Sequence, residues 1–76
     1  MIARYLKYGN DCLLYQTVVL EDNIIITINR EKGGWCDKAP RVSTKVYDTR
    51  LEAKTAFKQL CNELAQEYTK IYEVAK

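Results

Sequence analysis

The chain has 76 residues, of which 47% are hydrophobic and 29% charged, and its formal net charge is +2. A chain of this length forms one domain, because it buries only about 60% of its unfolded surface and cannot support two cores. The composition excludes disordered and collagen-like classes, and no run approaches the roughly 20 apolar residues of a membrane span. The N-terminus lacks the apolar core of a signal peptide, so we expect a cytoplasmic protein with no membrane partner.

Four strands are expected in the first 47 residues. Ile2–Tyr8 ends at the turn sequence GND, and the β-branched and aromatic residues of Cys12–Leu20 suit a second strand. Ile24–Arg30 alternates with a period of two, as does Arg41–Tyr47, which gives a third and a fourth strand. If Ile24, Ile26 and Ile28 face a covering helix, then Ile25, Thr27 and Asn29 face water.

A single helix is expected from Thr49 to Lys76. TRLE at Thr49–Glu52 is a capping box, and apolar residues then recur at spacings of three and four up to Tyr72. No glycine or proline follows Pro40, so nothing local stops this helix. It would span about 42 Å, against about 20 to 24 Å for the strands. Either the helix bends near AQEYT, or its last turns project past the sheet and need another surface.

These elements predict an α+β fold over a single domain, residues 1–76. The fold is a four-stranded antiparallel β-meander with one long C-terminal helix packed on one face. One helix covers only one side of a sheet. The other side should therefore be exposed.

The sequence lacks the residue patterns of catalytic and metal sites. It contains no histidine, which removes imidazole ligands and Ser-His or Cys-His pairs, and its three cysteines form no CxxC pair. No glycine-rich nucleotide motif is present. We therefore predict a non-enzymatic protein without cofactor or metal. Cys36 shares a loop with Lys32 and Lys38, whose charges favour a thiolate, so a reactive thiol there is an alternative to a structural role.

Basic residues are concentrated between Arg30 and Lys58, where eight stand against four acidic residues. Three of them repeat at i, i+4 and i+8 near the helix start, where cations oppose the macrodipole. Such a row is either a solvated helix face or a surface that meets an anionic partner. Aromatic residues are the candidate anchors, because tryptophan and tyrosine supply much of the contact area at interfaces. The predicted partner-binding residues are Tyr5, Tyr15, Trp35, Arg41, Lys45, Arg50, Lys54 and Lys58.

Three stretches resemble the small phage anti-CRISPR proteins that inhibit type I-F systems. They are RYL near the start, LLYQTVVLEDN in a hairpin position, and VYDTRLEAKTAFKQL as strand, cap and helix. The resemblance implies a sheet-and-helix protein that blocks a host complex by contact and without catalysis, with Tyr5 and Tyr15 on the binding face. The GGWCDKAP loop and the longer helix depart from that pattern. On this basis we expect an inhibitor from a phage or mobile element that acts in the host cytoplasm. Its partner would be a host defence nucleoprotein complex, blocked by steric and electrostatic competition.

A second resemblance gives an alternative function. GGW followed by VYDTRLEAKTAFKQL and EY is similar to the WGR domain, a sheet-and-helix module that binds nucleic acid, although the Trp-Gly-Arg signature is absent. The alternative is a nucleic-acid-binding module that places the same basic residues on phosphates. A third hypothesis is a homodimer formed through Ile71 and Tyr72 at the C-terminal end of the helix.

Overall fold

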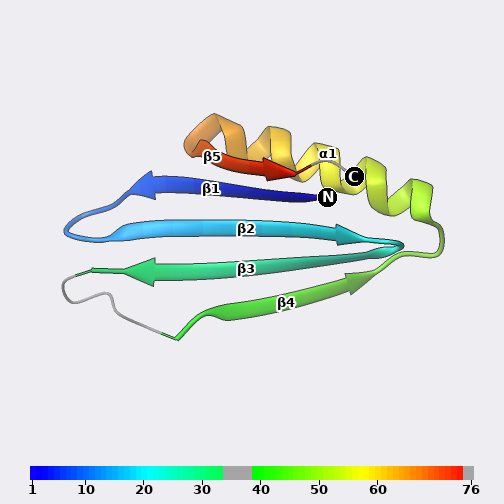
Figure 1. Cartoon of the computed structure of the whole chain (residues 1–76), viewed down its shortest axis with the longest axis horizontal. Helices are drawn as coiled ribbons and strands as arrows, with labels where there is room; N and C mark the ends of the chain where they lie inside the picture. Colours follow the sequence, from blue (N-terminus) through cyan, green and yellow to red (C-terminus); the bar gives the residue numbers. More distant parts are fainter. Residues whose placement is uncertain (34–38, 75–76) are drawn as a thin grey trace.

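Antiparallel strands dominate the computed structural model, which describes residues 1–33 and 39–74. In these residues one sheet of five strands has the spatial order β4-β3-β2-β1-β5 (Figure 1). The strands are β1 (Ile2–Tyr8), β2 (Leu13–Glu21), β3 (Ile24–Lys32), β4 (Arg41–Val46) and β5 (Thr69–Val74), and helix α1 (Arg50–Glu67) lies between the last two in sequence. The predicted α+β class is confirmed, as is the antiparallel order of the first four strands.

Two tight turns connect the first three strands. Asp11 and Asp22 adopt positive φ values of 62° and 54°, in the left-handed region that aspartate tolerates better than most residues. The Asn23 side chain donates a hydrogen bond to the Tyr47 carbonyl at 2.7 Å, and the Tyr47 amide donates to the Asn23 carbonyl at 2.8 Å. The β2–β3 turn is therefore fastened to the segment that leads into the helix.

The helix begins where the sequence predicts. Thr49 has extended backbone angles, and its hydroxyl accepts a hydrogen bond from the Glu52 amide at 3.1 Å. This contact satisfies one of the amides that have no partner in the first helical turn. Ala53 and Phe57, one turn apart, are the helix residues buried against the sheet.

The helix ends at Glu67, so the prediction of a helix reaching Lys76 is wrong. Tyr68 turns to an extended conformation, and its amide donates to the Leu64 carbonyl at 2.7 Å. Lys7 of β1 stabilises this end, because its ammonium lies 3.9 Å from the Glu67 carboxylate and 5.6 Å from the centroid of the Tyr68 ring. The 18 helical residues span about 27 Å, which matches the strand lengths.

The last residues form a fifth strand, which corrects the predicted four-stranded sheet. Threonine, isoleucine, tyrosine and valine make up most of Thr69–Val74, and these residue types favour strands. The strand pairs antiparallel with β1, with a change of register between Arg4 and Tyr5. Sequence reasoning missed β5 because the spacing of its apolar residues also fits a helix, and only the free edge of β1 decides between the two.

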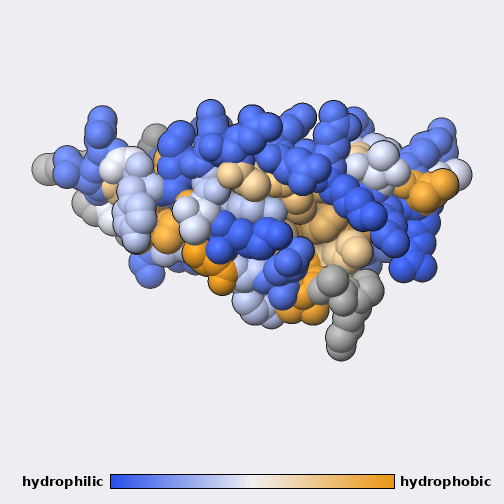
Figure 2. Space-filling model, turned by 90° about the horizontal axis from the view of Figure 1, so that it is seen from above, coloured by the Kyte–Doolittle hydropathy of each residue, from blue (hydrophilic) through white to orange (hydrophobic). Residues whose placement is uncertain are grey.

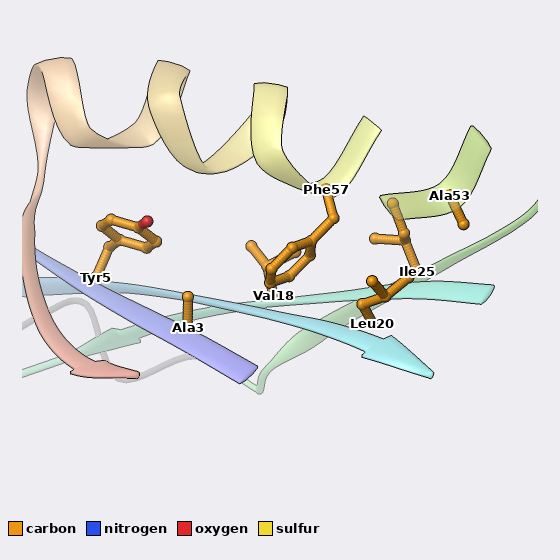
Figure 3. Close-up of a cluster of buried hydrophobic side chains, with 7 residues drawn as sticks. All are labelled: Ala3, Tyr5, Val18, Leu20, Ile25, Ala53 and Phe57. Atoms are coloured by element: carbon orange, nitrogen blue, oxygen red, sulfur yellow. The ribbon is translucent and has the colours of Figure 1, made fainter. Parts of the chain in front are cut away.

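The core lies between the helix and one face of the sheet (Figure 3). Strands β1, β2 and β3 contribute side chains from below, and α1 contributes two from above. The fully or nearly fully buried hydrophobic residues in the described parts of the chain are Ala3, Tyr5, Val18, Leu20, Ile25, Ala53 and Phe57. This is a thin core for a chain in which nearly half of the residues are hydrophobic.

The orientation of β3 is the reverse of the one considered from the sequence. Ile25 is only 4% exposed and packs beneath the helix, so Ile24, Ile26 and Ile28 point to the opposite face. Ile25 shares its side of β3 with Thr27 and Asn29, so alternation alone favours the wrong face for the core. The neighbouring strand decides, because Leu20 of β2 pairs with Ile25 and is itself buried in the core.

Candidate protein-docking surface

The face of the sheet opposite the helix, here called the open face, carries a cluster of aliphatic side chains. Strand alternation and pairing place eight of them there, because Ile2 pairs with both Val19 and Val74, and β3 aligns with β2 and β4. The aliphatic cluster consists of Ile2, Val19, Ile24, Ile26, Ile28, Val42, Val46 and Val74. Among residues 1–33 and 39–74, no helix or strand covers this cluster.

Exposure differs across the aliphatic cluster in a simple way. Val42 and Val46 on the edge strand are 63% and 65% exposed, whereas the members on central strands are half-buried because they flank one another. Seen from above, hydrophilic side chains line one long side of the molecule and hydrophobic side chains gather toward the other (Figure 2). Soluble monomers rarely expose a contiguous apolar surface of this kind, and such surfaces mark contact sites.

The end of the open face near the β1–β2 turn is aromatic and cationic. Tyr15 pairs with Leu6 on one side and Arg30 on the other, and it lines a shallow pocket of about 290 Å³ together with Arg4, Arg30 and Lys32. Arg4 donates a hydrogen bond from Nε to the Thr17 hydroxyl at 3.2 Å. Neither Arg30 nor Lys32 forms an ion pair with another described residue. This end therefore carries three positive charges without a neighbouring carboxylate partner.

Tyr15 is thus the predicted anchor that the structure places on the open face. Tyr5 is not, since its side chain is 0% exposed and packs in the core, so the prediction of Tyr5 as a surface anchor is wrong. The Tyr5 hydroxyl has no well-formed hydrogen bond among the described residues, and the group beside it is the Cys61 thiol, which is a weak partner. Burial raises the pKa of Tyr5 well above its ordinary value of 10.0, and the neighbouring Cys61 thiol and Glu73 carboxylate raise that pKa further. Trp35 and Cys36 lie outside the described residues.

The predicted basic residues do not form one surface. Lys45 pairs with Ile25 and therefore lies on the helix side of β4, as Arg41 does, and its ammonium is 5.2 Å from the centroid of the Tyr47 ring. Arg50 and Lys54 line a groove on the other flank of the helix together with Asp22, and Lys58 lines a further groove there. The helix separates the two groups. Asp22 also reduces the electrostatic effect of the cations that share its groove.

Sequence reasoning missed the aliphatic cluster and Arg4. A usable signal was present, because β3 has apolar residues in both alternating positions, and one helix can cover only one face. The cationic end was harder to foresee. Arg4 and Arg30 are far apart in sequence, and only the strand order brings both beside Tyr15.

The described residues contain no cluster of three or more histidine, cysteine, aspartate or glutamate side chains that could hold a metal ion. Within the same residues, no helix combines the length and apolarity that crossing a membrane requires. No protein-family model, curated protein or solved structure matches the chain. The open face is therefore interpreted from its own chemistry.

Proposed function

We propose that this chain is a non-enzymatic binding protein that docks another protein onto the open face of its sheet. The observation that carries the proposal is the exposed aliphatic cluster, which has no cover among the described residues. The centre of a protein interface is apolar and poor in charged residues, whereas its rim is polar. The open face has this arrangement, since aliphatic side chains occupy its centre and Arg4, Arg30 and Lys32 stand toward one end.

The resemblance to phage anti-CRISPR inhibitors gives the proposal a specific form. In this form the partner is a host defence nucleoprotein complex, and the protein inhibits that complex in the host cytoplasm by occupying its surface. Tyr15 and the aliphatic cluster supply the buried contact. The three cations at one end of the open face compete for an anionic site that otherwise receives nucleic acid. Because of their positions, Arg4, Arg30 and Lys32 replace the helix-side cations in this role.

A matched pair of surface variants tests the docking surface. Val46→Asp places a carboxylate on the open face at a side chain that is already 65% exposed, and Leu51→Asp does the same on the helix at one that is 73% exposed. Neither change buries a charge in the folded monomer, so neither should unfold it. Affinity for a purified type I-F surveillance complex, measured by surface plasmon resonance, should fall about tenfold or more for Val46→Asp and stay unchanged for Leu51→Asp. Equal affinities for the two variants would contradict the proposal.

A second candidate function, nucleic-acid binding, is favoured by the pocket around Tyr15. Three cations beside a half-buried aromatic ring resemble the grooves in which bases stack and phosphates pair with basic side chains. This candidate predicts that single-stranded DNA binds with an affinity that falls linearly in log salt, with a slope near −0.7 per neutralised phosphate. Arg30→Ala should weaken that binding and reduce the slope, whereas Lys54→Ala on the helix should change neither. Absence of binding at low salt removes the candidate.

A further inference from the structure

We infer that the open face of the free protein is covered by a second copy of the chain, packed sheet on sheet. The two copies are related by a two-fold axis that lies between the sheets and runs across the strands. The inference rests on the proposed function in one respect, since it takes the open face to be a protein-docking surface. It goes further by naming the occupant. It also specifies the relative orientation of the two copies.

The edges of the sheet are poorly suited to pairing between copies, whereas the open face is well suited to it. Edge strand β4 carries Arg41 and Lys45, and edge strand β5 carries Lys70, which pairs with Glu73 at 3.4 Å. Charges and irregular register on edge strands discourage edge-to-edge association. The register change in the β1–β5 pairing adds such an irregularity. The aliphatic cluster contains no charged residue, so association through the face has no comparable obstacle.

The aliphatic end of the open face is large enough for a weak, reversible pair. An axis at the level of Val19 overlaps at most about five residues of each strand, because β2 ends at Glu21. Five strands about 4.8 Å apart and five residues at 3.4 Å give a contact of about 24 by 17 Å. Two such faces bury on the order of 800 Å², which is the size of a transient interface. Sheets packed face to face lie about 10 Å apart with interdigitating side chains.

A two-fold axis across the strands at the level of Val19 pairs like surfaces. It turns each strand end for end onto the same strand of the second copy. Ile24 then lies over Ile28 of the second copy, and Val46 over its Val42. Aliphatic side chains thus meet aliphatic side chains across β3 and β4, where the exposed members of the cluster are found.

Charge selects this axis over the alternative. Glu21 stands at one end of β2, two residues beyond Val19, and Thr17 stands two residues before it. The axis across the strands places Glu21 over Thr17 of the second copy, beside the Arg4 side chain that donates to that threonine. Arg4 is exposed, and its terminal guanidinium N–H groups are available to a carboxylate. Symmetry produces this Glu21–Arg4 contact twice.

An axis parallel to the strands is unfavourable. It keeps each residue at its own level along the strands, so it would bring the cationic ends of both copies together, with Arg30 and Lys32 of each copy at the same end. If this axis ran between β2 and β3, it would also place Glu21 over Ile24 of the other copy. Like charges across an interface cost free energy, and so does a carboxylate against an apolar surface.

Analytical ultracentrifugation of the full chain tests the pair directly. A concentration series should show conversion from the 8.9 kDa monomer to a species of twice that mass. Glu21→Lys and Arg4→Glu should each weaken dimerisation about tenfold, and the combined charge reversal should restore it to within about threefold of wild type. Glu63→Lys, on the exposed side of the helix, should leave dimerisation unchanged. Urea unfolding of Arg4→Glu separates loss of the Thr17 hydrogen bond from loss of the contact between copies.

The possible outcomes separate this inference from the proposed function. Wild-type protein that stays monomeric up to about 200 μM overturns the inference, and the proposed function stands if Val46→Asp still weakens target capture. A protein that dimerises but does not bind the surveillance complex supports the inference and not the proposed function. A dimer that survives Val46→Asp but is lost on Ile71→Asp forms through β5, and it overturns the inference. Single charge reversals that the combined variant does not restore overturn the orientation.

Discussion

Tyr5→Phe tests the core most directly, because it removes one oxygen atom and leaves the packing unchanged. The Tyr5 ring is fully buried, and its hydroxyl has no well-formed hydrogen bond among the described residues. A buried hydroxyl without a good partner costs about 1 to 3 kcal/mol. Its removal should therefore raise the free energy of unfolding by about 1 kcal/mol at pH 7. If the hydroxyl made a good hydrogen bond, the same substitution would instead lower the free energy of unfolding.

The same variant should change the pH dependence of stability. The pKa of Tyr5 is raised in the folded state above its unfolded value of 10.0, chiefly by burial. The folded protein therefore holds this proton more tightly than the unfolded chain does, so the stabilisation is complete below pH 10 and is lost as the pH rises above it. Between pH 10 and 11 the wild type should lose about 1 kcal/mol through this group, and Tyr5→Phe should not.

Urea unfolding followed by circular dichroism at pH 7, 9, 10 and 11 measures both effects. A reductant keeps the thiols in one state across the series. Tyr8→Phe is the matched control, because Tyr8 is 78% exposed. Its replacement should change neither the free energy of unfolding at pH 7 nor the loss of stability above pH 10. A loss of more than about 1 kcal/mol for Tyr5→Phe at pH 7 would show that the hydroxyl makes a stabilising hydrogen bond, and the reasoning would be wrong.

Two further predictions concern the helix. Thr49→Ala removes the hydroxyl that accepts from the Glu52 amide and should lower the free energy of unfolding by about 1 kcal/mol, whereas Thr55→Ala, the same replacement inside the helix, should leave it within about 0.5 kcal/mol of wild type. Phe57→Ala removes the largest side chain that the helix contributes to the core and should cost about 3 to 5 kcal/mol in thermal or urea unfolding, against less than about 0.5 kcal/mol for Leu51→Ala on the exposed side.

Local sequence signals were sufficient for four strands and the helix start. Period-two alternation and the turns at Asp11 and Asp22 mark β1 to β3, and the Thr49 cap marks the beginning of α1. The helix end was not predictable in this way. Tyr68, Ile71 and Tyr72 continue the helical spacing, but Tyr68 caps the helix and the other two lie in β5. They form a strand because pairing with β1 supplies backbone hydrogen bonds and covers the free edge of β1.

The docking surface was predictable in kind but not in detail. One helix and one sheet imply an uncovered face, which follows from geometry alone. Which residues occupy that face depends on the orientation of β3, and its isoleucines occupy both alternating positions. The predicted cationic surface failed for a related reason. Arg41 and Lys45 are separated from Arg50 and Lys54 by the helix itself, and a linear sequence does not show on which flank each group falls.

Different parts of the open face determine affinity and orientation. If about 65% of the roughly 800 Å² buried is apolar, its removal from water contributes on the order of 13 kcal/mol, against about 4 to 15 kcal/mol lost in association. This contribution comes almost entirely from the aliphatic cluster, because an exposed ion pair such as Glu21–Arg4 adds at most about 1 kcal/mol. Charges at the ends of an apolar face instead discriminate between docking orientations that bury similar areas. Val46→Asp should therefore weaken every use of the open face, whether the occupant is a second copy or a host protein, while charge reversal at Glu21 should weaken only the pairing of two copies.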